Sequence, residues 1–273
     1  FICGCLCGIV VVLVSPRTHL RVIWSLFSFS LGIWGIGLYF AFIALDDNTA
    51  LFWARFLNTA AIAIPVLFFH FILFLTDFYS QKKKELIFYY IVTALYLLFS
   101  IFSPELFVSN VIPKLNFRFY PTAGPSYYFF PAMFNYFVVY GLALLIMKFM
   151  QETSSLRKMQ FKYVLIGSAI GFSGGATTFP LVFNIGIYPF GTMQVPVYLF
   201  IITYAIIKFR LMDITMFMMN MGIFVSVYSF VLGIPFVLAI WGNQWLVKII
   251  GASWFLVPML ILLIFATAGP FIY

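Results

Sequence analysis

Charged side chains are scarce in this sequence. Only 8% of its 273 residues are Asp, Glu, Lys or Arg, whereas 64% are hydrophobic and the mean hydropathy is +1.11. Soluble domains carry roughly 25% charged residues, and a folded globule of this size cannot bury so large an apolar surface. The composition therefore excludes a soluble enzyme, a nucleic-acid-binding module and a disordered tail, and it indicates an integral membrane protein.

Groups that catalysis or metal binding would need are also few. The chain has seven acidic residues and two histidines. It has no His-Glu-x-x-His metal motif, no pair of intramembrane aspartates and no Gly-x-Ser-x-Gly elbow. Asp77 and Asp213 lie at the ends of predicted helices, where a carboxylate is simply hydrated. We therefore expect no catalytic residue, no enzymatic activity of this chain, no cofactor and no metal.

Cysteine occurs only as Cys3, Cys5 and Cys7, within the first predicted span. This segment contains no histidine, so a metal site there lacks ligands. The favoured interpretation is apolar helix residues, with lipidation or redox sensing as alternatives. His70 lies inside another predicted span, where a polar residue is often functional. Because no second histidine or acid lies beside it, an interhelical hydrogen bond is the favoured role.

Long charge-free stretches separate the charged residues. An α-helix needs about 20 apolar residues to cross the bilayer core. The fold class that we expect is all-α, a polytopic transmembrane helical bundle. The stretches predict nine spans, at residues 1–15, 22–44, 51–76, 86–103, 128–150, 161–184, 193–210, 216–241 and 252–273.

Lysine and arginine predict the orientation, because cytoplasmic loops carry an excess of them. With the N-terminus outside, eleven of the 15 basic residues fall on the cytoplasmic side, and only Arg55, Lys114, Arg118 and Lys248 fall on the outer side. The sequence thus predicts a multi-pass protein of the cell inner (plasma) membrane with a cytoplasmic C-terminus. The basic excess favours contact with anionic lipid over nucleic acid. Residues 104–127 form the one long connection, on the outer side.

Several polar groups are predicted at similar depths beneath the outer surface, counting 1.5 Å per helical residue. Polar groups at one depth on four helices favour a water-accessible pocket for a ligand, with the 104–127 loop as its lid. Ordinary interhelical hydrogen bonding, with glycine for close packing, is the alternative. The candidate ligand-binding residues are Arg55, Asn58, Asn135, Thr177, Thr178 and Gln194.

Prolines within the predicted spans can kink their helices, because each frees a backbone carbonyl. Kinked, glycine-rich helices suit a protein that changes shape. The adjacent Gly174 and Gly175 are the candidate moving part. The prolines concerned are Pro65, Pro131, Pro180, Pro196, Pro235 and Pro258.

Two segments carry a family resemblance. They are RKMQFKYVLIGSAIGFSGGATTFPLVF, at residues 157–183, and YAIIKFRLMDI, at residues 204–214. Together they resemble the end of the seven-transmembrane N-terminal region of bacterial sensor histidine kinases. The resemblance covers roughly residues 1–214. Residues 215–273 would add two transmembrane helices, as in some nine-span quorum-sensing receptor kinases, and lead to a cytoplasmic output domain absent from this chain.

The resemblance implies a membrane-embedded sensor module of a two-component signalling protein. Such a module binds a small amphiphilic signal molecule in its outer half and passes the change to a cytoplasmic kinase. The implied partners are this molecule, the lipid bilayer and a second copy, in a homodimer held through the missing cytoplasmic domain. The chain has no phosphoacceptor segment and no glycine-rich ATP lid, so we expect no kinase activity from it. A small-molecule transporter or channel is the alternative function.

Overall fold

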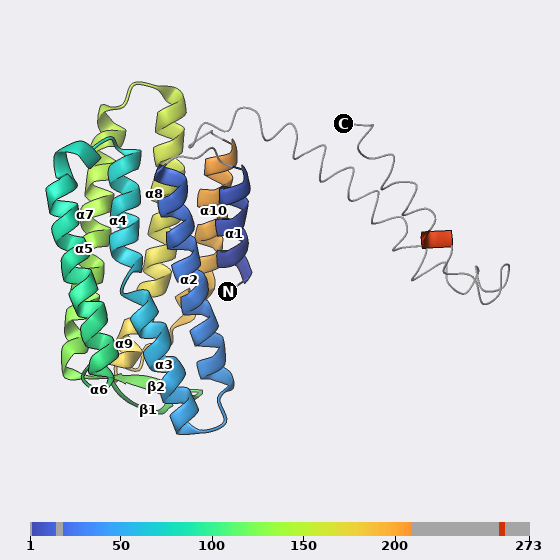
Figure 1. Cartoon of the computed structure of the whole chain (residues 1–273), viewed down its shortest axis with the longest axis vertical. Coiled ribbons are helices and arrows are strands. Elements are labelled where there is room, and N and C mark those ends of the chain that lie inside the picture. The colour runs from blue at the N-terminus through green and yellow to red at the C-terminus, as the bar shows by residue number, and fades with distance from the viewer. Residues whose placement is uncertain (1, 15–18, 209–256, 260–273) are drawn as a thin grey trace. The chain divides into compact units, whose positions relative to one another are not determined.

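The computed structural model describes residues 2–14, 19–208 and 257–259 (Figure 1). The chain divides into two compact units, Phe1–Ile214 and Thr215–Tyr273. The first unit is described almost completely and contains the site. Of the second unit only three helical residues, 257–259, are described, so the last two predicted spans lie outside the described residues apart from these three.

The first unit is a bundle of helices with a small β-hairpin at one end (Figure 1). Its long helices are α1 (Ile2–Val14), α2 (His19–Ile43), α3 (Asp47–Ala61), α4 (Ile64–Leu75), α5 (Tyr79–Phe102), α7 (Phe129–Gln151), α8 (Ser155–Ala176) and α10 (Gln194–Lys208). Short helical segments are α6 (Pro104–Phe107), η1 (Pro125–Tyr128), α9 (Thr178–Val182) and η2 (Phe190–Met193).

Among the described residues, five segments are long and apolar enough to cross a membrane. They correspond to α2, α3 with α4, α5, η1 with α7, and α8 with α9. Two shorter apolar helices, Cys3–Val12 and Phe190–Ile206, match the first and seventh predicted spans. The prediction of a membrane protein built mainly from helices is therefore confirmed in this part of the chain.

The third predicted span is two helices and not one. Asp46 begins α3, because its carboxylate accepts a hydrogen bond from the backbone N–H of Thr49 at 2.8 Å. The helix stops at Ala61, and Pro65 occupies the first turn of α4. A proline in that position cannot donate to the preceding turn, so the helix restarts there. Ten of the twelve α4 residues are buried, which makes α4 the centre of the bundle.

The expectation of a purely α fold is wrong in one place. Within the predicted outer loop, β1 (Val108–Lys114) pairs antiparallel with β2 (Phe117–Ala123). Leu115 lies in the turn and has a φ of 51°, in the left-handed region. The hairpin closes one end of the bundle, and we call that end the hairpin end (Figure 1).

The opposite end of the bundle carries the helix connections α4–α5 and α7–α8 (Figure 1). Many of the basic residues predicted to be cytoplasmic lie there, at the start of α5 and around the α7–α8 connection. The sequence therefore grouped these connections correctly on one side. The structure contains no membrane, so the direction of the bundle in the bilayer stays a prediction.

Candidate functional site

A cavity lies at the hairpin end of the bundle, and the empty space within and just outside it amounts to about 960 Å³. Most of its wall is apolar and aromatic. Residues of α2, α3, α7, α8 and α10 line its sides, while β2, η1 and α9 contribute residues at the hairpin end.

Two of the six predicted ligand-binding residues, Asn58 and Thr178, line this cavity. Asn58 is 5% exposed and donates from Nδ2 to the Ala54 carbonyl at 2.7 Å. This bond fixes the orientation of the amide, so its Oδ1 accepts the hydroxyl proton of Tyr127 at 2.9 Å. Thr178 donates its hydroxyl proton to the Gly175 carbonyl at 2.8 Å.

Arg55 and Asn135 do not join the cavity wall. The Arg55 side chain binds β1, with Nε 3.1 Å from the Val108 carbonyl and a terminal nitrogen 3.3 Å from the Ser109 carbonyl. Asn135 is exposed on α7 and donates to the Pro131 carbonyl of its own helix at 2.8 Å. The cavity therefore gives no support to a ligand-binding role of these two residues.

Thr177 and Gln194 belong to a crossing of α8 with the start of α10. Thr177 donates to the Gly174 carbonyl at 2.7 Å and accepts the backbone N–H of Gly191 at 3.2 Å. A Cβ added at Gly174 would lie 2.3 Å from the Gly191 carbonyl oxygen and 2.9 Å from the Gln194 Cβ. These residues therefore hold two backbones together beside the cavity.

The adjacent Gly175 has the opposite surroundings. It lines the cavity, and a Cβ added there would meet nothing within 4 Å. The sequence suggested these two glycines as one moving part, but their surroundings differ. Gly174 allows two backbones to pack closely, whereas Gly175 leaves space open in the cavity.

Three tyrosines of the cavity wall were missed at the level of sequence. Tyr120 donates to the Thr178 carbonyl at 3.2 Å, and Tyr127 to Asn58. Tyr198 is 2% exposed, and its ring packs against Phe27 and Phe172. Aromatic residues make up 22% of the sequence, so none of these tyrosines stood out. The aromatic character of residues 104–127 was the available signal for Tyr120 and Tyr127.

Residues 1–215 match the family described as the N-terminal 7TM region of histidine kinase. The chain belongs to this family. The match ends at residue 215, one residue beyond the end of the first compact unit at Ile214. No curated protein and no solved structure matched the chain. The first unit is therefore the membrane sensor region of a histidine kinase, and the predicted nine-helix quorum-sensing form stays a proposal.

Lys114 ties the hairpin of this sensor region to α9. It is 8% exposed, and its ammonium donates to the carbonyls of Pro121, Leu181 and Val182 at 2.8, 2.9 and 3.2 Å. Burial lowers the pKa of Lys114 to about 8, because the charged form loses its hydration. The sequence predicted an outer loop lysine and gave no sign of this role.

Polar groups also lie between helices nearer the other end of the sensor region. His70 of α4 is hydrogen-bonded through Nδ1 to the Tyr90 hydroxyl of α5 at 2.8 Å, in accord with the interhelical role favoured from the sequence. Glu85 of α5 accepts from Tyr89 at 2.7 Å and from Lys82 at 3.1 Å. Tyr140 of α7 contacts the same pair, so these bonds join α5 to α7.

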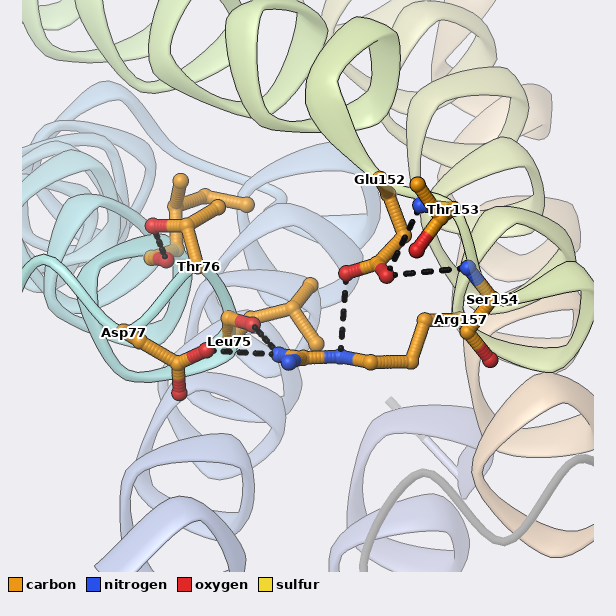
Figure 2. Close-up of polar contacts among 8 residues, drawn as sticks. Leu75, Thr76, Asp77, Glu152, Thr153, Ser154 and Arg157 are labelled. Carbon is orange, nitrogen blue, oxygen red and sulfur yellow. Dashed lines mark hydrogen bonds and ion pairs between the residues drawn. The ribbon is translucent and has the colours of Figure 1, made fainter.

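Arg157 bridges the α4–α5 connection and the α7–α8 connection at this end of the bundle, as Figure 2 shows. Its guanidinium lies 2.8 Å from the Asp77 carboxylate and 3.6 Å from that of Glu152, and it donates to the Leu75 carbonyl at 3.3 Å. The Glu152 carboxylate also accepts the backbone N–H of Ser154, which lowers the pKa of Glu152. We call Asp77, Glu152 and Arg157 the connection joint.

Within the part of the chain that the structure describes, no group of three metal-ligating side chains is found. The three cysteines of α1 are free thiols, and Cys7 is buried. In the described part of the sensor region, the cavity at the hairpin end is a feature that suits a small organic molecule.

Proposed function

We propose that this chain is the input part of a two-component signalling protein, and that a small amphiphilic molecule binds in the cavity at the hairpin end. The observation that carries the proposal is the cavity itself. Its wall is mainly apolar, and a few polar groups, including Asn58 and Thr178, lie on it. Polar anchors in an apolar wall recognise a polar head attached to an apolar body.

The position of α10 supports a route of transmission toward a kinase. Tyr198 of α10 lines the cavity, and α10 packs along α8 and α1. A ligand changes the output only if it binds one arrangement of helices better than another. We propose that such a difference moves α10 relative to α8, and that residues 215–273 carry it through two further helices to a cytoplasmic kinase domain, which also holds a homodimer.

We also propose that the hairpin end faces the outside of the plasma membrane. The distribution of basic residues supports this orientation, because most of them cluster at the opposite end. Reporter domains fused in the Leu115 turn and at Lys83 test it. The first should report an outside location and the second a cytoplasmic one, and the reverse pattern would contradict the proposal.

Filling the cavity tests the proposed function directly. In Gly175→Leu the new side chain enters open space, so it should fold normally and occupy the room of a ligand. A bias of about 1–2 kcal/mol between two signalling states changes their ratio by about 5- to 30-fold. We therefore expect autophosphorylation of the full-length protein in native membranes to change by several-fold in one direction.

Gly186→Leu is the matched control. Gly186 is exposed in the connection before η2, and a Cβ added there also meets nothing within 4 Å. The control should reach the membrane in the same amount and keep the wild-type output. If Gly175→Leu also keeps the wild-type output, the cavity is not the input site.

A further inference from the structure

Two cations lie close to the cavity wall, and both are already bound to backbone. Arg55 binds two carbonyls of β1. Lys114 binds one carbonyl of β2 and two of α9. Neither lines the cavity, and the lining residues within the described part of the chain include no Asp, Glu, Lys, Arg or His. A charged ligand would therefore be buried there without a counter-charge, which is costly in an apolar environment.

Three of the four hydroxyl groups on the described cavity wall donate to acceptors within the protein, and the fourth, that of Tyr198, is buried without a hydrogen-bond partner among the described residues. Thr178 and Tyr120 both donate to backbone carbonyls, which can only accept. Tyr127 donates to the Asn58 Oδ1, whose role as acceptor is fixed by the bond from Nδ2 to Ala54. The three protons are thus engaged within the protein. Each oxygen keeps lone pairs, so each can still accept a hydrogen bond from a ligand.

We infer that the cavity selects an uncharged amphiphile whose head donates a hydrogen bond, such as an alcohol or a secondary amide with an apolar body. This inference rests on the proposed function and specifies the ligand of the same site. The lack of charge in the described wall excludes carboxylates and ammonium groups. The engaged hydroxyl protons of Thr178, Tyr120 and Tyr127 favour a donor head over a head that only accepts. The apolar and aromatic walls contact the body of the ligand.

A series of four probes with the same apolar body tests the charge and the head separately. The purified 273-residue chain, in phospholipid nanodiscs, is titrated with decanol, decyl methyl ether, decanoate and decylammonium. Protection against thermal unfolding is measured for the wild type and for Gly175→Leu. Only the protection that the wild type shows in excess of Gly175→Leu is counted as cavity binding, because a probe's general effects on the bilayer are the same for both proteins.

We expect decanol to bind the wild type with a cavity-dependent signal. The ether should bind about fivefold more weakly, because it lacks the donated hydrogen bond. The two charged probes should bind about a hundredfold more weakly or not at all. Cavity-dependent binding of decanoate or decylammonium as tight as that of decanol would overturn the exclusion of charge. Equal binding of ether and decanol would overturn the preference for a donor.

Thr178→Val removes one acceptor oxygen with little change of shape. This variant should weaken the binding of decanol by about fivefold and leave the binding of decyl methyl ether unchanged. Thr192→Val is its control, since the Thr192 hydroxyl donates to the Pro189 carbonyl with the same spacing and does not line the cavity. Should decanol fail to bind while Gly175→Leu still alters kinase output, the inference on the ligand fails and the proposed function stands. If both tests are negative, both fail.

The same chemistry is found in diffusible signals and in membrane lipids that carry a free hydroxyl or amide. Mass spectrometry of molecules that copurify with the wild type but not with Gly175→Leu distinguishes these sources. A copurifying neutral alcohol or amide supports the inference and identifies the membrane as the source. Decanol binding without any copurifying molecule supports a diffusible source, and a copurifying fatty acid contradicts the inference.

Discussion

Gly174 and Gly175 are neighbours in α8, yet a methyl group added to each meets opposite surroundings. At Gly174 the Cβ would lie 2.3 Å from the Gly191 carbonyl oxygen, which is backbone and cannot rotate away. Overpacking of this kind costs about 1–3 kcal/mol. At Gly175 the Cβ meets nothing within 4 Å, so alanine gains about 0.4–1 kcal/mol by restricting the unfolded chain.

We therefore expect Gly174→Ala to lower the free energy of unfolding and Gly175→Ala to leave it unchanged or raise it. The two variants should differ by about 2–3 kcal/mol. The assay is unfolding of the purified chain from bicelles with sodium dodecyl sulfate, followed by far-UV circular dichroism. Because the variants have the same composition, their hydrophobicity and detergent binding are matched. Equal stabilities, or a more stable Gly174→Ala, would refute the close crossing of α8 with η2.

Two further predictions concern charged groups outside the spans. A double-mutant cycle of Asp77→Asn and Arg157→Gln should give a coupling free energy of about 0.5 kcal/mol, because this pair of the connection joint is partly exposed. The coupling should fall at high salt. A coupling of zero at low salt would contradict the contact. For Lys114 the folded pKa of about 8 lies below the ordinary value of 10.5, so the unfolded chain binds the proton more tightly between these values. Wild-type stability should therefore rise from pH 8 to pH 10.5 relative to Lys114→Met, by up to about 3 kcal/mol, and parallel pH profiles would show that the lysine is not buried.

Hydropathy predicted the helices well because a bilayer leaves a chain few alternatives to them. It placed the starts of α5 and α8 too late, because the predicted spans 86–103 and 161–184 began after the charged residues Glu85 and Lys158. Both helices continue through their basic residues, with Lys83 and Lys158 exposed at the helix ends. Long basic side chains can extend from a helix end toward water, so they need not interrupt it.

The hairpin was missed for a different reason. Its strands contain Pro113 and Pro121, which weaken any strand pattern, and its register is irregular in two places. What holds it is tertiary, namely the contacts of Arg55 and Lys114 with backbone carbonyls. Such contacts leave no periodic trace in the sequence.

For the candidate site, the sequence did not show which face of each helix borders the cavity. Asn58 and Thr178 line the cavity, while Asn135 points away from it. On α7 the flanking Phe134 and Phe137 are buried, so the intervening residues occupy the exposed face of the helix. In a helix that is apolar all round, nothing in the sequence distinguishes these faces.

The order of the cavity walls along the chain has a consequence for biosynthesis. The first walls, from α2 and α3, are made early, the hairpin and α7 follow, and the wall that contains Tyr198 comes with α10. A nascent chain that has not yet inserted α10 therefore presents an open apolar groove to the surrounding lipid. The cavity exists only after nearly the whole sensor region has been synthesised, so the lipid tails that solvate the groove during insertion must leave it when α10 docks.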